Sequence, residues 1–587
     1  MTGAYRFGPI IGRNDVTFRL WAPGAKNVTL LCDGRHAMDR SEDGWFTKTM
    51  PGVPPGTHYK FRIDDEIDVP DPASRFQPND VHGPSELIDP AYDWHARGWK
   101  GRPWHECVFL ELHVGTFTGD GTFRDAIDKL NRVAEAGFTA IELMPVADFY
   151  GRWNWGYDGV LLYAPDSAYG RPDDLKALID AAHQRGLMVF LDVVYNHFGP
   201  EGNYLGRYAP QFFCKANTPW GNAIDYENPH VRRFAIENAL YWLRDFRFDG
   251  LRLDAVHAIT EPGWSILLNE LSEAAGRLAS ETGRHIHLVL ENDANQASLL
   301  DPTADPPQGK YRAQWNDDFH HVFHVLLTGE TAGYYGDYRE PAGHVARTVA
   351  KGFVYQGEPS PHRKGEKRGE PTSTLPATAF VNFLQNHDQI GNRALGERLS
   401  VLAPPAALEA ALAVTLLAPA PPLMFMGDEW GAREPFPFFC DFKGDLADAV
   451  RNGRRSEFAE AYARYKGEVP DPLSEKTVQL ARLDWTAIEQ PEHRGRLDLV
   501  RRLLAARKSS VIPRLPQLQQ GPGHAEFANG VLTAQWTFAS GETLSMLANL
   551  NEQSRVRPAA FNGKPVWGGA PPDELPPWSV CAAIGDP

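Results

Sequence analysis

Four short segments of this 587-residue chain begin with apolar, β-prone residues and end in carboxylate, amide or imidazole side chains. They are residues 192–197 (DVVYNH), 250–257 (GLRLDAVH), 288–292 (LVLEN) and 383–388 (FLQNHD). This pattern is typical of buried parallel strands whose carboxyl ends open into a site. One acid after an apolar run often only caps a helix. Four such runs in succession favour a shared catalytic rim.

Between these segments the chain alternates strand-like and helix-like patterns. Strands are predicted at residues 107–114, 139–145, 188–195, 250–256, 287–291, 311–315, 379–384 and 423–426. Helices are predicted at residues 123–136, 173–185, 231–246, 264–279, 318–327 and 406–417. The alternation predicts an α/β fold, a closed (β/α)8 TIM barrel with inserted loops. No GxGxxG pattern follows the first strand, which argues against a dinucleotide-binding sheet.

The length of the chain exceeds what one hydrophobic core usually holds, so further domains are expected. Period-two runs such as residues 16–21 (VTFRLW), separated by Gly, Pro and Asp, predict a β-sandwich near the N-terminus. Short β-like runs return near the C-terminus. We predict an N-terminal β-sandwich at residues 1–97, a catalytic barrel at 105–510 and a C-terminal β-sandwich at 515–587.

Two long insertions interrupt the barrel pattern. Residues 199–228, rich in Gly, Tyr and Asn, follow the third strand, and residues 357–376, rich in Lys, Arg and Pro, precede the seventh. Loops of this length inside a compact domain are usually functional or mobile. For the second insertion, a solvated flexible loop is an equally good interpretation.

Composition excludes several kinds of partner. The net charge of −16 disfavours nucleic acid, because phosphate binding needs clustered Lys and Arg. The five cysteines are scattered without CxxC spacing, which predicts neither a disulfide framework nor a zinc site. The chain has no signal-like start and no apolar run of about 18 residues, so a cytoplasmic protein without a membrane partner is expected.

In such a barrel the active site lies at the carboxyl ends of the strands. Arg252, two residues before Asp254, should point to the same side of its strand and keep this carboxylate ionised, as a nucleophile requires. Glu291 follows apolar residues without a cation beside it in sequence, and therefore suits a general acid. Such a pair of carboxyl groups performs glycoside hydrolysis. For Arg252 and Asp254, a purely structural ion pair is the alternative.

Aromatic residues near the same rim suit a sugar, whose rings have apolar faces and hydroxyl edges. Residues 153–158 (WNWGYD) follow the second strand, and residues 315–319 (WNDDF) follow the sixth. The alternative for the second group is a helix N-cap by Asn316 or Asp317, and both interpretations can hold together.

The four segments, in this order, resemble the conserved regions of glycoside hydrolase family 13, the α-amylase family, and residues 144–146 (MPV) resemble its additional short motif. The resemblance spans about residues 105–510, and the N-terminal region is similar to a carbohydrate-binding module of family 48. It implies Asp254 as nucleophile, Glu291 as acid/base and Asp388 as the third acid. Retention of configuration, with two carboxyl groups about 5 Å apart, is the implied mechanism.

The resemblance also implies which residues bind the sugar. They are Tyr157, His197, Arg252, His257, Trp315, Asn316, Asp317, Asp318, Phe319, His387, Gln389 and Asn392. Many members of the family bind calcium near the asparagine that corresponds to Asn196. Because residues 199–228 contain no acid-rich ligand set, we predict no essential metal and no cofactor.

Within the family, residues 111–116 (ELHVGT), 154–159 (NWGYDG), 315–319 and 386–391 (NHDQIG) look like the trehalose-releasing members. The implied reaction is hydrolysis of the α-1,4 bond next to the terminal trehalose unit of maltooligosyltrehalose or a related α-glucan oligosaccharide. A maltooligosyltrehalose synthase would act in the same pathway. The alternative is a 1,4-α-glucan branching enzyme or another glucanase of the family, although branching enzymes usually carry Glu where Gln389 stands. A catalytically inactive binding protein is a third possibility, disfavoured because all three acids are present.

Overall fold

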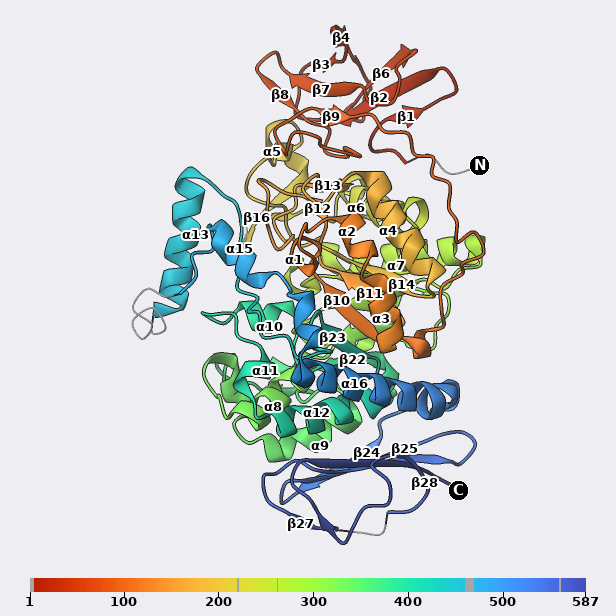
Figure 1. The fold of residues 1–587 in the computed structure, drawn as a ribbon. Coiled ribbons are helices and arrows are strands. Elements are labelled where there is room, and N and C mark those ends of the chain that lie inside the picture. Colours follow the sequence, from red (N-terminus) through yellow and green to blue (C-terminus); the bar gives the residue numbers. More distant parts are fainter. Residues whose placement is uncertain (1–4, 219–220, 261, 460–468, 559–560, 587) are drawn as a thin grey trace.

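The structure, a computed structural model, describes residues 5–218, 221–260, 262–459, 469–558 and 561–586. It has three regions in a row, with an N-terminal β-rich region at one end, a barrel in the middle and a C-terminal sheet at the other end (Figure 1). Among the described residues, no helix is both long and apolar enough to cross a bilayer.

Eight parallel strands close into a barrel in chain order, which confirms the predicted TIM fold. They are β10 (Phe109–Leu112), β11 (Ala140–Leu143), β14 (Met188–Val193), β17 (Gly250–Leu253), β18 (His287–Leu290), β19 (Ala313–Trp315), β22 (Phe380–Phe383) and β23 (Pro422–Phe425). Leu253 pairs with Leu290, so the next residues, Asp254 and Glu291, leave adjacent strands at the same level. The register therefore brings the ends of two motif strands together.

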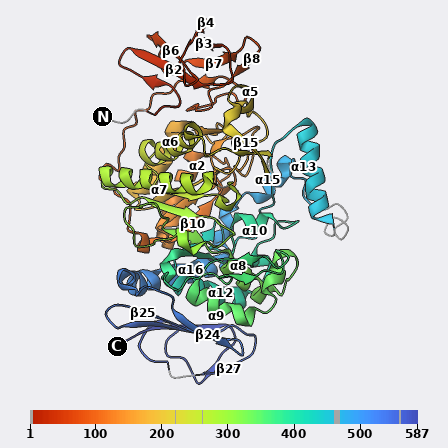
Figure 2. The ribbon, with the colours of Figure 1, turned by 180° about the vertical axis from the view of Figure 1, so that it is seen from behind.

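Helices enclose the barrel on its outer side (Figures 1 and 2). They include α4 (Pro172–Gln184), α6 (Pro229–Asp245), α7 (Gly263–Thr282), α8 (Asp317–Thr328), α9 (Pro341–Lys351), α12 (Pro405–Leu417) and α16 (Pro491–Ala506). In α4 a proline begins the first turn, and Asp173 and Asp174 lie near the positive end of the helix dipole. Its buried residues Leu175, Leu178 and Ala182 recur at helical spacing.

One predicted helix is divided in the structure. Residues 123–136 form α2 (Phe123–Ile127) and α3 (Leu130–Ala136) instead of one continuous helix. The Thr122 hydroxyl accepts a hydrogen bond from the Asp125 amide and begins α2. Gly137, with φ of 106°, ends α3 in a left-handed conformation that glycine adopts without strain.

The N-terminal region consists of two antiparallel sheets. One is ordered β1 (Ile10–Ile11), β2 (Asp15–Trp21), β6 (Trp45–Pro51), β5 (Asp39–Arg40). The other is ordered β4 (Arg35–Ala37), β3 (Val28–Leu31), β7 (His58–Ile63), β8 (Ile67–Val69), with β9 (Ser85–Glu86) paired to β7. Strand β2 (Asp15–Trp21) alternates buried and partly exposed residues, as its period-two sequence predicts. The first insertion reaches this region, since the amide of Gly24 donates to the carbonyl of Tyr208 at 2.9 Å. That contact joins the N-terminal sheets to a barrel loop.

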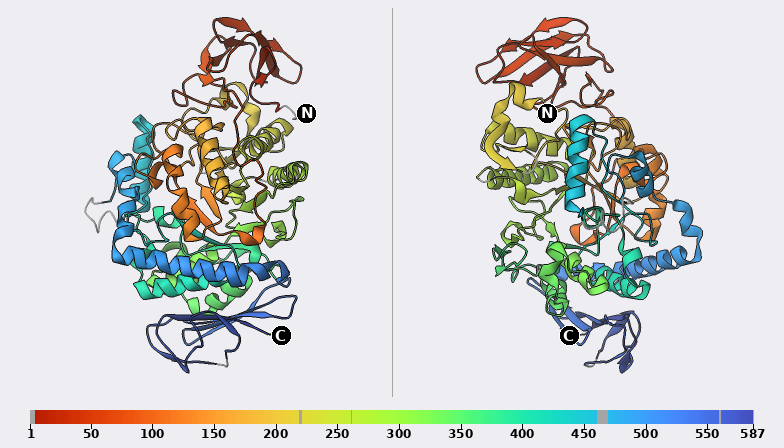
Figure 3. Two further views of the ribbon diagram at one scale, coloured as in Figure 1. Left: turned by 45° about the vertical axis from the view of Figure 1, so that its right-hand side comes forward. Right: turned by 90° about the vertical axis from the view of Figure 1, so that its left-hand side faces the viewer.

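The C-terminal region has a five-stranded antiparallel sheet and a small two-stranded sheet. The first is ordered β24 (His524–Ala528), β25 (Val531–Thr537), β26 (Thr543–Asn549), β30 (Ser579–Gly585), β28 (Lys564–Trp567), and the second pairs β27 (Arg555–Val556) with β29 (Glu574–Leu575). Helices α9 and α16 lie between this sheet and the barrel (Figure 3). Helix α13 (Gly444–Glu457) lies beside the barrel (Figure 1) and contributes residues to its cavity.

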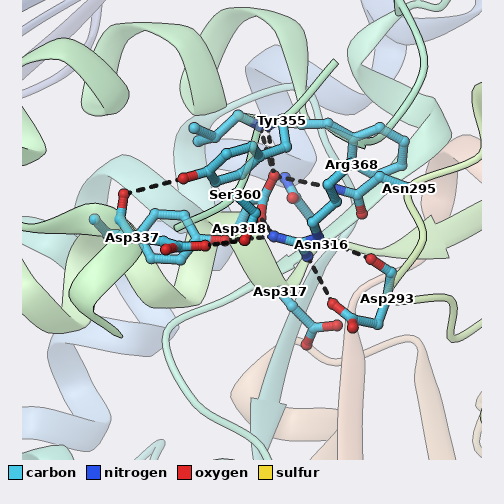
Figure 4. A network of polar contacts seen from close by, with 12 residues as sticks. Asp293, Asn295, Asn316, Asp317, Asp318, Asp337, Tyr355, Ser360 and Arg368 are labelled. Carbon is cyan, nitrogen blue, oxygen red and sulfur yellow. Dashed lines mark hydrogen bonds and ion pairs between the residues drawn. The ribbon is translucent and has the colours of Figure 1, made fainter. Parts of the chain in front are cut away.

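The second insertion is mostly exposed but has a defined backbone structure. It forms an antiparallel hairpin of β20 (Glu358–Pro359) and β21 (Lys367–Arg368), in which Glu358 pairs with Arg368. The side chain of Arg368 is only 5% exposed. A buried arginine with ionic partners fixes the hairpin against the barrel (Figure 4).

Candidate active site

The carboxyl ends of the barrel strands open into a cavity of about 990 Å³. Asp254 and Glu291 directly follow β17 and β18, and Asp388 lies in the first turn of α10 (His387–Gly391), just after β22. All three side chains line the cavity, so the structure brings together the three acids that the sequence motifs predict.

Arg252 connects two of these acids. Its Nη1 donates to Asp254 Oδ1 at 2.6 Å, and its Nη2 lies 3.7 Å from Glu291 Oε2. The contact with Asp254 confirms that the two side chains point to the same side of β17. The guanidinium also lies over the ring of Trp315, with 4.2 Å between Cζ and the ring centroid.

The backbone after Asp254 supports the same geometry. Ala255 has a φ of 39°, in the left-handed region that non-glycine residues rarely adopt. Its amide donates to Glu291 Oε2 at 2.6 Å. This turn holds the carboxyl group of Glu291 beside that of Asp254.

The pKa values of these two acids move in opposite directions. Burial raises the pKa of Asp254, but the charge of Arg252 and a hydrogen bond from Asn196 outweigh it and bring the pKa below its usual value. Burial raises the pKa of Glu291 well above its usual value, and the charge of Asp254 raises it further. The surroundings thus favour the ionised form of Asp254 and the protonated form of Glu291, which are the forms of a nucleophile and a general acid.

Two further acids, Asp317 and Asp388, line the same cavity. Burial raises the pKa of Asp388, whose Oδ1 accepts a hydrogen bond from Asn392 Nδ2 at 2.7 Å. Burial, together with the charges of Asp293 and Asp388, raises the pKa of Asp317 to about 7. Gln389 Nε2 donates to Asp317 Oδ1 at 3.3 Å. This face of the cavity therefore changes its charge near neutral pH.

Aromatic and imidazole rings form the wall next to Arg252. The ring of Tyr157 stacks on His387 with 5.1 Å between centroids, and its hydroxyl donates to Asp192 Oδ2 at 2.6 Å. His197 Nε2 is 2.8 Å from the carbonyl of Tyr157. An apolar ring edged by polar groups matches the surface of a sugar.

Comparison with known proteins agrees with this geometry. The model of the α-amylase catalytic domain matches residues 111–211, carbohydrate-binding module 48 (isoamylase N-terminal domain) matches residues 6–82, and a domain of unknown function (DUF3459) matches residues 521–582. The malto-oligosyltrehalose trehalohydrolase of Deinococcus radiodurans is 43% identical over 554 residues, which cover 93% of this chain and 90% of that protein. This chain belongs to the malto-oligosyltrehalose trehalohydrolase family, within the α-amylase family.

As a member of this family the chain is a glycoside hydrolase. A crystal structure described as a putative α-amylase from Salmonella typhimurium superimposes with a TM-score of 0.94 at 46% identity, covering 99% of this chain and 100% of that chain. The 1,4-α-glucan branching enzyme GlgB of Shewanella baltica is 33% identical over 282 residues, only 42% of this chain.

The calcium position that occurs elsewhere in the α-amylase family does not suit the residues present. Asn196 uses its amide nitrogen to donate to Asp254, and its side-chain oxygen contacts His197. Among the described residues, no group of three or more His, Cys, Asp or Glu side chains is arranged to hold a metal ion.

Most of the predicted sugar-binding residues line the cavity, but three do not. Asn316 caps α8 by accepting from the Phe319 amide, and its Nδ2 donates to Asn382. Asp318 is buried beneath the cavity, and Phe319 packs in the hydrophobic core. These three side chains lie outside the cavity, because successive residues of a helix start point in different directions. Only Asp317 of this helix start reaches the cavity.

Two buried acids beneath the cavity were missed by sequence reasoning. Asp192 accepts from Arg252 Nη1 at 2.8 Å, and Glu111 Oε1 is 2.5 Å from His387 Nδ1. Both lie within barrel strands. Asp192 begins the segment DVVYNH, and Glu111 begins the segment ELHVGT. A charged residue inside an apolar strand was the available signal, since such a group needs a partner.

Proposed function

We propose that this family member hydrolyses the α-1,4 bond between a maltooligosaccharide and its terminal trehalose unit, and releases trehalose. Asp254 attacks the anomeric carbon while Glu291 gives its proton to the departing oxygen of trehalose. Glu291 then takes a proton from water, which displaces Asp254 from the covalent glycosyl intermediate. The observation that carries the catalytic part of this proposal is the position of both acids beside one guanidinium, with Asp254 at 2.6 Å and Glu291 at 3.7 Å from Arg252. The opposite directions of their pKa shifts support it.

The remaining cavity residues complete the proposed mechanism. Asp388 acts as the third acid, which distorts the bound ring and stabilises the positive charge of the transition state. Tyr157 stacks on this ring, and His197, Arg252 and His387 bind its hydroxyls. His257 lies on the leaving-group side, where its Nδ1 accepts from the Asp293 amide at 3.2 Å.

The choice of substrate rests on the relatives. Seven relatives that are 35% to 43% identical carry the name malto-oligosyltrehalose trehalohydrolase. We further propose that a maltooligosyltrehalose synthase supplies the substrate. We also propose a cytoplasmic location, which the five free cysteine thiols support. For the domains, the proposed division remains residues 1–97, 105–510 and 515–587.

Product analysis on three substrates side by side tests the function. Purified protein should release trehalose from maltooligosyltrehalose and act much more slowly on maltopentaose and amylose. Equal rates on all three would refute the trehalose-specific function while leaving a glucanase. New α-1,6 linkages in amylose would instead identify a branching enzyme, the alternative suggested by the partial match to GlgB.

A further inference from the structure

A second cavity, of about 390 Å³, lies where the N-terminal region meets the barrel helices α4 and α6 (Figure 1). We call it the junction pocket. Its walls include Ile10, Ile88 and Pro90 from the N-terminal region, Lys176 from α4 and Tyr241 from α6. Its volume is within the range of about 300–1,000 Å³ that is usual for small-molecule sites. The junction pocket shares no lining residue with the catalytic cavity, so it is a separate candidate site.

The charged side chains of the junction pocket are mainly basic. They are Arg75, Lys176 and Arg244, with Asp245 as the one acid among the lining residues that the structure describes. The chain as a whole has a net charge of −16, so this local excess of positive charge is opposite in sign to the overall charge. A cavity lined by one sign of charge concentrates ligands of the other sign. The junction pocket therefore favours an anion.

Arg75 is the most deeply enclosed of these cations. Its Cζ lies 4.2 Å from the ring centroid of Tyr241 and 4.5 Å from that of Tyr163. Its Nη2 donates to the Phe7 carbonyl at 3.1 Å. Its Nη1 is buried and, within the described parts of the chain, has no hydrogen-bond acceptor. Buried donors without an acceptor are uncommon in folded proteins, and they indicate a missing partner.

Lys176 supplies a second buried cation. Its side chain is only 2% exposed, and its Nζ donates to the Pro90 carbonyl at 2.9 Å and lies 3.6 Å from Asp173 Oδ1. Burial lowers the pKa of Lys176, so its charge is not fully compensated by these neighbours. An ammonium group has three donors, and at least one of them remains for a ligand.

The rest of the junction pocket suits a ring. Ile10 and Ile88 form apolar wall, and Ile11, which also lines the pocket, is 43% exposed. Asp245 accepts from the Tyr5 hydroxyl at 3.1 Å and offers its carboxylate to hydroxyl donors. Apolar walls with a few polar groups are typical of sites for small organic ligands. The combination fits an anion that carries a hydroxylated ring better than it fits an inorganic ion.

We propose that the junction pocket binds a phosphorylated hexose, with its phosphate held by Arg75 and Lys176 and its ring against the apolar wall. A guanidinium fork and an ammonium group both bind phosphate oxygens. Such a ligand would contact the N-terminal region and the barrel helices together. It would therefore stabilise the folded chain in proportion to its occupancy.

Isothermal titration calorimetry of the full chain tests this proposal, with glucose 6-phosphate, glucose 1-phosphate and inorganic phosphate as separate probes. At least one hexose phosphate should bind saturably and more tightly than inorganic phosphate, and should raise the melting temperature as its concentration rises. Arg75→Met and Lys176→Met should each raise its Kd about ten- to hundredfold, as expected for a lost hydrogen bond from a charged group. Both side chains are buried, so a more exposed variant is also needed. Arg244→Gln, at a side chain that is 26% exposed, should raise the Kd about three- to tenfold.

Arg232→Gln is the matched control. Arg232 and Arg244 both lie on α6, and each pairs with a glutamate of α7, at 3.1 Å to Glu270 and 3.4 Å to Glu281. Arg232 does not line the junction pocket, so its replacement should leave the Kd unchanged. Hydrolytic activity at the wild-type level shows that each variant is folded. The proposal would be overturned by wild-type protein that binds neither hexose phosphate, by equal affinity for inorganic phosphate, or by a Kd that Arg75→Met and Arg244→Gln leave unchanged.

Discussion

Glu111 on the first barrel strand and His387 at the end of the seventh are joined by a 2.5 Å contact between Oε1 and Nδ1. The Glu111 carboxylate also accepts from the His387 amide at 3.1 Å. Burial lowers the pKa of His387, but the charge and hydrogen bond of Glu111 outweigh it, so the pKa is raised. A charged imidazole is therefore held beside Tyr157.

We expect Glu111→Gln to destabilise the fold by about 1–3 kcal/mol, because it leaves a buried imidazole without its charged partner. A raised pKa contributes stability that is fully present below the unfolded pKa of about 6.5, and this contribution is lost as pH rises through the folded value. The difference in unfolding free energy between wild type and variant should thus be largest below pH about 6.5 and shrink above it. Chemical denaturation over a pH series measures this.

The control is Glu526→Gln, which removes the acid from an exposed Glu–His pair in which Glu526 is 75% exposed. It should change stability little at any pH. A pH-independent loss in Glu111→Gln would contradict the charged state of His387.

Asp254→Asn and Glu291→Gln should each lower turnover by several orders of magnitude, with substrate binding largely retained. The two variants should differ on a glucosyl fluoride, because fluoride departs without a proton. Glu291→Gln should then still form the glycosyl intermediate, whereas Asp254→Asn should not. Mass spectrometry of the protein after mixing detects the intermediate, and its appearance in Asp254→Asn would reassign the nucleophile.

Asp317→Asn should move the alkaline limb of the pH profile toward acid. Asp317 ionises at a pKa of about 7, and its negative charge raises the pKa of Glu291. Without that charge Glu291 loses its proton at lower pH, so the limb of kcat/KM should shift down by about one pH unit. Asp68→Asn, in the N-terminal region, should leave the limb unchanged. A shift in the opposite direction would contradict the coupling of the two acids.

Arg454→Ala, on α13, should weaken binding of the substrate. Arg454 Nη2 donates to the Gly391 carbonyl at 3.0 Å, and its Nη1 donates to Asn392 Oδ1 at 3.3 Å. Asn392 in turn donates to Asp388. We expect KM to rise about tenfold, as for one charged hydrogen bond. The neighbouring exposed Arg455→Ala is the control, and initial-rate kinetics compare the two. Equal effects of both substitutions would attribute the change to the helix rather than to Arg454.

Local sequence was sufficient for the barrel and for the placement of the three acids at one rim. Asp254 and Glu291 directly follow short apolar strands, and Asp388 lies in the first helical turn after another. Local sequence was insufficient where partners are distant in the chain. Arg368 and Asp293 are separated by 75 residues and Glu111 and His387 by 276, so only the folded chain shows these pairs. It was also insufficient at Asp128 and Lys129, where one helical pattern is divided, because apolar spacing continues across the break.

The hairpin closes on itself at its base, where the Gly357 amide donates to the Arg368 carbonyl at 2.8 Å. The two ends of the hairpin are therefore adjacent. The segment between these ends can be exchanged without moving the barrel strands that precede and follow it. An exchanged hairpin will be held in the same position only if the recipient protein has an aspartate after β18 and another at the start of α8. In this chain these are Asp293 and Asp318. Transfer of this part of the cavity wall to a related barrel therefore requires the hairpin together with two acids from separate barrel segments, Asp293 and Asp318.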